Sequence, residues 1–157
     1  MKSAVAAVAM LWLSGVLESS LSPRLAIGYG SPDFPLIVLV CLGLFCDRRA
    51  TTLLGFGAGL VQGAVAGANL TLYIATRSVA GFLLGWFNQL EVQGNLLVAG
   101  LVCFVVSLGA QLLLMFLGVY HGSLPPFLAG TLITAVYNGV IAMPVYALLN
   151  KLARSTR

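Results

Sequence analysis

Charged side chains are scarce in this chain, which has 4 acidic and 8 basic residues among 157. Four carboxylates and one histidine leave few groups for acid–base catalysis, and the sequence contains no HExxH, GxSxG, Walker or CxxC pattern. The three cysteines, Cys41, Cys46 and Cys103, lack the spacings of metal ligands and are expected to be small buried apolar residues. The sequence therefore predicts no enzyme activity, no cofactor and no metal site.

Apolar residues dominate instead: 60% of the chain is hydrophobic, and the mean hydropathy is +1.03. A chain of this length cannot hide so much apolar surface in a core of its own, so the excess must face lipid. We therefore predict an all-α integral membrane protein that forms one domain over residues 1–157.

Six apolar segments are candidates for membrane-spanning helices, each of which needs about 20 mostly apolar residues. The predicted spans are residues 3–21, 32–46, 51–65, 69–87, 96–119 and 125–149. The second and third are short. A single tilted helix over 51–76 is the alternative, and it would reduce the number of spans to five.

The distribution of basic residues favours six spans, because cytoplasmic loops are enriched in Lys and Arg. With six spans and both termini inside, Arg24 is outside, Arg77 lies within a span, and the other basic residues are cytoplasmic: Lys2, Arg48, Arg49, Lys151, Arg154 and Arg157. Five spans would put the "DRR" sequence and the basic tail on opposite sides. The net charge of +4 indicates contact with anionic lipid rather than nucleic acid.

Glycine recurs at every fourth position in "GFGAGLVQGAVAG". Helices in lipid associate through close packing, and small residues on one face allow their backbones to approach. We therefore predict a helix-packing interface at Gly55, Gly59, Gly63 and Gly67, with a second, shorter stripe at Gly81 and Gly85 that could meet the first. The alternative is that glycine is simply common in membrane helices.

Arg77 lies within a predicted span, where a charge is unfavourable unless it faces protein or water. It shares an i, i+4 row with Gly81, so its side chain is expected to point from the small-residue face into the bundle. Glu18 is the first predicted partner and Asp33 the second. The alternative is an arginine that snorkels to water and lipid headgroups.

Two uncharged polar residues and one proline also stand out within the spans. Gln62 borders the glycine stripe, and both it and Asn138 are expected to form hydrogen bonds between helices. Pro144 has no N–H to donate to Val140, so we predict a kink near the middle of the last helix.

Several stretches, taken in order, resemble the rod shape-determining protein MreD family. They are "SPDFPLIVLV", "DRRATTLLGFGAGLVQG", "GFLLGWF", "NLLVAGLVCFVVSL" and "AVYNGVIAMPVYALLNKL". The resemblance covers nearly the whole chain after residue 20 and rests on order and spacing more than on any one motif. Many members carry an acidic residue where Gln62 stands, so no role of that carboxylate is carried over.

The resemblance implies a non-enzymatic scaffold subunit of the bacterial cell-elongation machinery for peptidoglycan, in the cytoplasmic membrane. Such a subunit binds the single-pass protein MreC and works beside MreB, RodA and a penicillin-binding transpeptidase; a homodimer within a larger complex is also compatible. The family is similar in fold to the S components of energy-coupling-factor vitamin transporters, which gives the alternative function. "SAVAAVAM" lacks the strict AxxxA that S components typically use to engage their transport partner.

Overall fold

The computed structural model describes residues 2–67, 69–87, 95–118 and 122–155, and in these ranges it is helical with no strand. One antiparallel bridge joins Ile27 to Gly30. The elements are α1 (Lys2–Ser20), the short 3₁₀ helix η1 (Ser22–Arg24), α2 (Phe34–Gly43), α3 (Arg48–Ala66), α4 (Leu70–Phe87), α5 (Leu96–Phe116) and α6 (Leu124–Ser155). The prediction of an all-α chain is confirmed for the described residues.

The six helices fall where the six apolar segments were predicted, with changes at their ends. The alternative of one helix over 51–76 is wrong, because α3 ends at Ala66 and α4 begins at Leu70. Gly67, the C-cap of α3, has a φ of 66°, a left-handed conformation that ends a helix, and Asn69, directly before α4, has a φ of 56°. Helices α3 and α4 therefore form an antiparallel hairpin.

Three helices are long and apolar enough to cross a membrane: α4, α5 and the Leu124–Ala153 part of α6. Two shorter apolar helices cover Val5–Ser20 and Phe34–Gly43. Helix α3 is not among the three, since its arginines, threonines and glutamine lower its hydropathy. Length and composition therefore support a helical membrane protein with three candidate spans in the part of the chain that is described.

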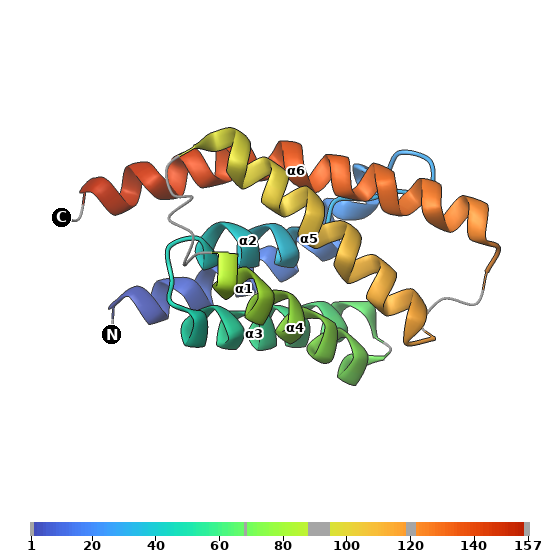
Figure 1. Ribbon diagram of the computed structural model, residues 1–157, viewed down its shortest axis with the longest axis horizontal. Helices are drawn as coiled ribbons and strands as arrows, with labels where there is room; N and C mark the ends of the chain where they lie inside the picture. Colours follow the sequence, from blue (N-terminus) through green and yellow to red (C-terminus); the bar gives the residue numbers. More distant parts are fainter. Residues whose placement is uncertain (1, 68, 88–94, 119–121, 156–157) are drawn as a thin grey trace.

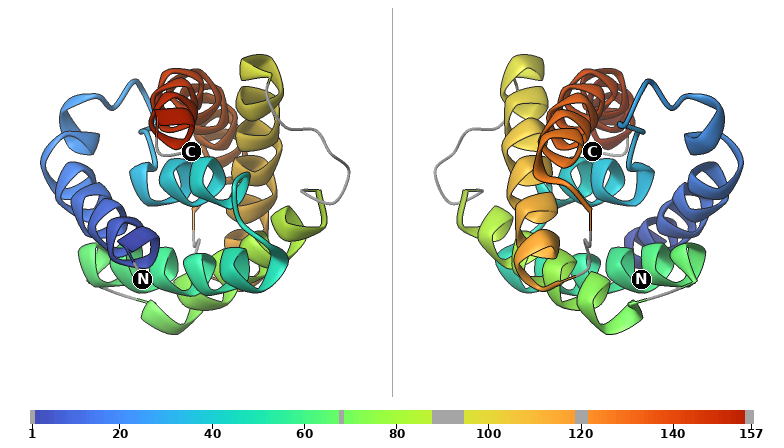
Figure 2. Two further views of the ribbon diagram at one scale, coloured as in Figure 1. Left: turned by 90° about the vertical axis from the view of Figure 1, so that its left-hand side faces the viewer. Right: turned by 90° about the vertical axis from the view of Figure 1, so that its right-hand side faces the viewer.

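Helix α2 lies at the centre of the bundle, with the other five helices packed around it (Figure 2). The predicted span over 32–46 is helical for only 10 residues, or about 15 Å, half the thickness of a bilayer's hydrocarbon core. Leu36, Leu39 and Val40 have no exposed surface. Protein therefore surrounds this short helix.

The start of α1, the start of α3 and the end of α6 lie at one end of the bundle (Figure 1). The α3–α4 hairpin turn and the start of α6 lie at the other end. Helix α6 has 32 residues and continues beyond the predicted end at 149. Pro144 lies inside this helix, and the kink expected there stays a prediction.

The two glycine stripes meet between α3 and α4. A Cβ atom on Gly59 would lie 2.5 Å from Ile74 Cα, and one on Gly63 would lie 2.6 Å from Leu70 Cδ1. On Gly55 it would collide with the carbonyl oxygen of Arg77. No side chain fits at these positions, so the α3 backbone rests directly on α4.

The α4 glycines face α3 in the same way. A Cβ atom on Gly81 would be 2.5 Å from Thr51 O, and one on Gly85 would be 2.7 Å from Arg48 Cα. Gly67 differs from the prediction, because no atom lies within 4 Å of its Cβ position. Gly67 ends α3 and does not take part in the contact between α3 and α4. The other five predicted glycines make that contact.

Candidate functional site

One polar side chain from each helix enters a cluster at the N-terminal end of α2. We call this set the central polar cluster: Glu18 from α1, Asp33 at the N-cap of α2, Gln62 from α3, Arg77 from α4, Ser107 from α5 and Asn138 from α6. Arg77, Ser107 and Asn138 have no exposed surface. The cluster therefore links the whole bundle through its interior.

Arg77 forms the ion pair of the cluster. Its Nη2 donates to Asp33 Oδ2, and its Nε donates to Gln62 Oε1 at 2.7 Å. The side chain points inward, but its partner is Asp33, so the first choice of Glu18 was wrong. Nη1 is buried without a hydrogen-bond partner in the described protein.

The start of α2 explains the positions of Asp33 and Glu18. The first backbone N–H groups of a helix have no partner within the helix, and at the start of α2 side chains supply those partners. Asp33 Oδ1 accepts from Leu36 N at 3.0 Å, and Glu18 Oε2 accepts from Phe34 N at 2.9 Å. Glu18 on α1 therefore caps α2, and its bond to Phe34 N holds the Glu18 carboxylate at the start of α2.

Asn138 on α6 forms the hydrogen bonds that link the start of α2 to α5. Its Oδ1 accepts from Asp33 N at 2.9 Å, and its Nδ2 donates to Ser107 Oγ at 2.9 Å. Asn138 thus bonds across helices, as expected for an amide in a span. Ser107 was not predicted, because a single hydroxyl in "LVCFVVSLGA" gives no signal of its own.

The groups of the cluster are suited to hydrogen bonds and an ion pair between helices. It contains one guanidinium, two carboxylates, two amides and one hydroxyl, in which the carboxylate of Asp33 balances the charge of Arg77. Among the described residues, no three His, Cys, Asp or Glu side chains gather where they could hold a metal ion. The bonds run directly from the start of α2 to α1, α4 and α6, and they continue through Arg77 to α3 and through Asn138 to α5, so the cluster fixes how the helices are arranged.

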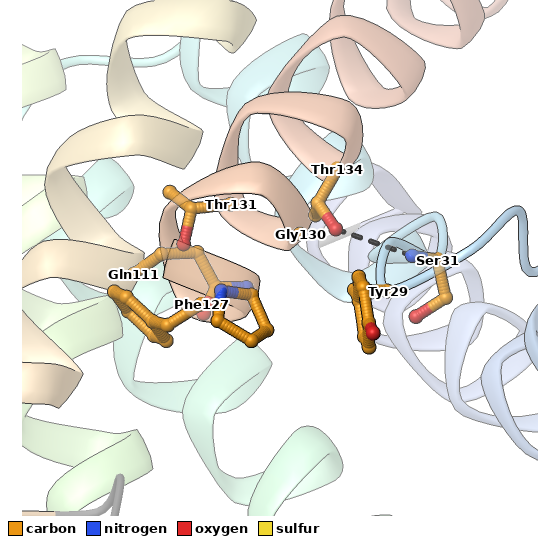
Figure 3. Close-up of a pocket in the computed structure, with 8 residues that line it drawn as sticks. Tyr29, Ser31, Gln111, Phe127, Gly130, Thr131 and Thr134 are labelled. Atoms are coloured by element: carbon orange, nitrogen blue, oxygen red, sulfur yellow. Dashed lines mark hydrogen bonds between the residues drawn. The ribbon is translucent and has the colours of Figure 1, made fainter. Parts of the chain in front are cut away.

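A small pocket of about 260 Å³ lies beside the stretch that leads into α2 (Figure 3). Gln111, Phe127 and Thr131 line one side, and Tyr29 and Ser31 face them. The remaining lining residues are Pro126, Gly130 and Thr134. None of these side chains carries a formal charge, so the pocket suits a neutral polar molecule better than an ion.

The turn that carries Tyr29 is fixed against α6. Ile27 and Gly30 exchange two backbone hydrogen bonds of 2.9 and 3.1 Å, and Ser31 N donates to Thr134 Oγ1 at 3.2 Å. A Cβ atom on Gly130 would lie 2.6 Å from Tyr29 O, so only glycine allows this approach. The same stretch continues to Asp33, which connects the pocket wall to the central polar cluster.

No family model, no curated protein and no solved structure matches this chain. The resemblance to the MreD family therefore rests on the sequence stretches alone and remains a hypothesis.

Proposed function

We propose that this chain is a non-enzymatic scaffold subunit of a bacterial cell-elongation complex, similar to MreD, and that it binds MreC. The observation that carries the proposal is the central polar cluster, in which polar side chains from six helices are joined by hydrogen bonds to one another and to the backbone at the start of α2. Groups used in this way stabilise one arrangement of helices and leave apolar outer faces for other membrane helices. MreB, RodA and a penicillin-binding transpeptidase are the further partners that the resemblance implies.

The membrane arrangement in this proposal has six spans in the bacterial cytoplasmic membrane, with both termini in the cytoplasm. Arg48 and Arg49 begin α3, and Lys151 lies near the end of α6, so these cations belong to the end of the bundle where α1 starts. Arg24 ends η1, which follows the far end of α1. This asymmetry supports the orientation, because basic residues are retained on the cytoplasmic side.

Topology reporters test the arrangement. A reporter at residue 49 or after residue 157 is expected to be cytoplasmic, and one at residue 122 is expected to be external. The same side for 122 and 157 would rule out six spans.

A groove between α1 and α3 is the candidate docking face for MreC. It has a volume of about 510 Å³ and is lined by small and apolar side chains, among them Trp12, Gly15, Val16, Ala64 and Val65. In lipid, a single-pass helix binds through close contact with such small residues. The groove faces outward, since Trp12 and Val16 are more than half exposed.

Coexpression with the MreC of the same genome tests binding, followed by purification through a tag on one partner and size analysis. The wild type is expected to give a stable complex, and Ala64→Leu, which fills the groove, is expected to reduce its yield. Ala129→Leu is the matched control, because Ala129 is exposed on α6 away from the groove. Equal yields for both variants would exclude this face.

The alternative is a substrate-binding S component of a vitamin transporter. The observation behind it is the pocket beside Tyr29, where hydroxyl and amide groups line a volume of about 260 Å³, slightly smaller than typical ligand pockets. Mass spectrometry of the purified protein separates the two functions. A tightly retained small molecule, together with failure to bind MreC, would replace the scaffold function by this one.

A further inference from the structure

A basic groove lies where α3 begins and α4 ends. It is an open cavity of about 810 Å³, lined by Asp47, Arg48, Arg49, Thr52, Leu53 and Phe82. Exposed apolar side chains adjoin the two arginines: Leu53 is 71% exposed and Trp86 is 54% exposed. The groove therefore combines cations with a surface suited to hydrocarbon.

Arg48 is held in place by two aromatic rings. Its guanidinium carbon lies 4.1 Å from the centre of the Phe82 ring and 4.8 Å from the Trp86 ring. Gly85 allows this, because a Cβ atom there would lie 2.7 Å from Arg48 Cα and 3.0 Å from its Cβ and Cγ. These ring contacts use none of the guanidinium N–H groups in hydrogen bonds to the described residues, so those groups are available to an acceptor.

The two arginines have no carboxylate partner among the described residues, where the ion pair found is that of Arg77 with Asp33. Asp47 also lines the groove, so its formal charge is +1 when the three charged side chains are taken together. The Asp47 carboxylate accepts no capping hydrogen bond from α3. A positive groove with unused guanidinium donors is suited to an anion from outside the chain.

We propose that this groove binds the headgroup of an anionic phospholipid, with its phosphate against Arg48 and Arg49. The acyl chain would lie along Leu53 and the aromatic rings of α4. Arginine forms paired hydrogen bonds with phosphate, aromatic rings gather at the membrane interface, and anionic lipids are attracted by basic groups at the cytoplasmic surface. This inference rests on the proposed membrane arrangement but not on MreC binding.

Native mass spectrometry of the protein in a neutral detergent tests the site, with phosphatidylglycerol or phosphatidylcholine added. The wild type is expected to retain phosphatidylglycerol in preference. Each arginine contributes about a fivefold gain in affinity, so Arg48→Gln with Arg49→Gln is expected to weaken binding about 25-fold. Arg24→Gln in η1 and Lys151→Gln in α6 are charge-matched controls that should keep the preference.

Three results would overturn the proposal: equal retention of both lipids by the wild type, an unchanged preference in the double variant, or displacement of the lipid by inorganic phosphate. If the double variant does not fold, Arg49→Gln alone serves, because its exposed side chain has no hydrogen bond or ion pair among the described residues. That variant should melt like the wild type without lipid and bind phosphatidylglycerol about fivefold more weakly. Copurification with MreC is a separate readout, so either proposal can fail alone.

Discussion

The α3–α4 contact and the central polar cluster stabilise the same bundle by opposite means. Between α3 and α4 the backbones touch because side chains are missing at Gly55, Gly59 and Gly63. In the cluster, six polar side chains fill the space between helices and form hydrogen bonds with one another or with the backbone at the start of α2. An added atom should therefore disrupt the first region, and a removed atom the second.

The two regions meet at Arg77. Its backbone carbonyl lies against Gly55, and its side chain reaches Asp33 and Gln62. The close approach of α3 to α4 thus also sets how far the guanidinium extends towards α2. Variants that act on one region at a time can separate the two contributions.

The largest effect is expected from splitting the ion pair of the cluster. Asp33→Asn or Arg77→Gln leaves one buried charge without its partner, which should lower the free energy of unfolding by about 3–5 kcal/mol. The double variant should lose less than either single variant, because no unpaired charge remains. Unfolding in detergent, combined in a double-mutant cycle, measures this; strictly additive losses would mean that the two groups are independent.

Adding one carbon to the glycine contact should have a smaller effect. Gly59→Ala places Cβ against the backbone of α4, which cannot rotate away, and should destabilise the protein by about 1–3 kcal/mol. Gly109→Ala on α5 is the matched control, since no atom lies within 4 Å of its Cβ position. It should be neutral or stabilising by up to about 1 kcal/mol. Equal melting temperatures for the two variants would show that the close backbone contact between α3 and α4 does not contribute to stability.

The smallest effect is expected at the edge of the cluster. Ser107→Ala removes the acceptor for Asn138 Nδ2 and leaves that donor buried, which should destabilise the protein by about 1 kcal/mol. Ser19→Ala is the control, because its hydroxyl is exposed and bonds only to Val16 O in its own helix. Thermal unfolding of both variants checks this, and a loss at Ser19 as large as that at Ser107 would contradict it.

The helices and one of their faces could be predicted from the sequence, because each depends on local pattern. Apolar runs predicted the six helical segments, and the fourfold spacing placed Gly55, Gly59 and Gly63 on one face. Gly67 has the same spacing, but the helix ends before it. Its left-handed φ depends on where α3 stops, which a periodic pattern does not specify.

The partners within the cluster could be predicted only in part. The inward direction of Arg77 follows from its row on α4, but the choice between Glu18 and Asp33 depends on where α2 begins. Because α2 starts inside the bundle, Asp33 becomes its N-cap beside Arg77, and Glu18 is used by Phe34 N. The role of Ser107 could not be predicted from the sequence, since its bond to Asn138 joins residues 31 positions apart.

In the proposed membrane arrangement, the short helix α2 would constrain how the chain enters the bilayer during synthesis. Ten apolar residues are too few to partition into a bilayer unaided, and the backbone before them needs partners at membrane depth. Those partners include Asn138 on α6 and Thr134 one turn before it, which the ribosome supplies about a hundred residues after α2. We therefore expect α2 to remain at the membrane surface until α6 has been made. It would then be the last helix to insert to its final depth, although it is the second to be synthesised.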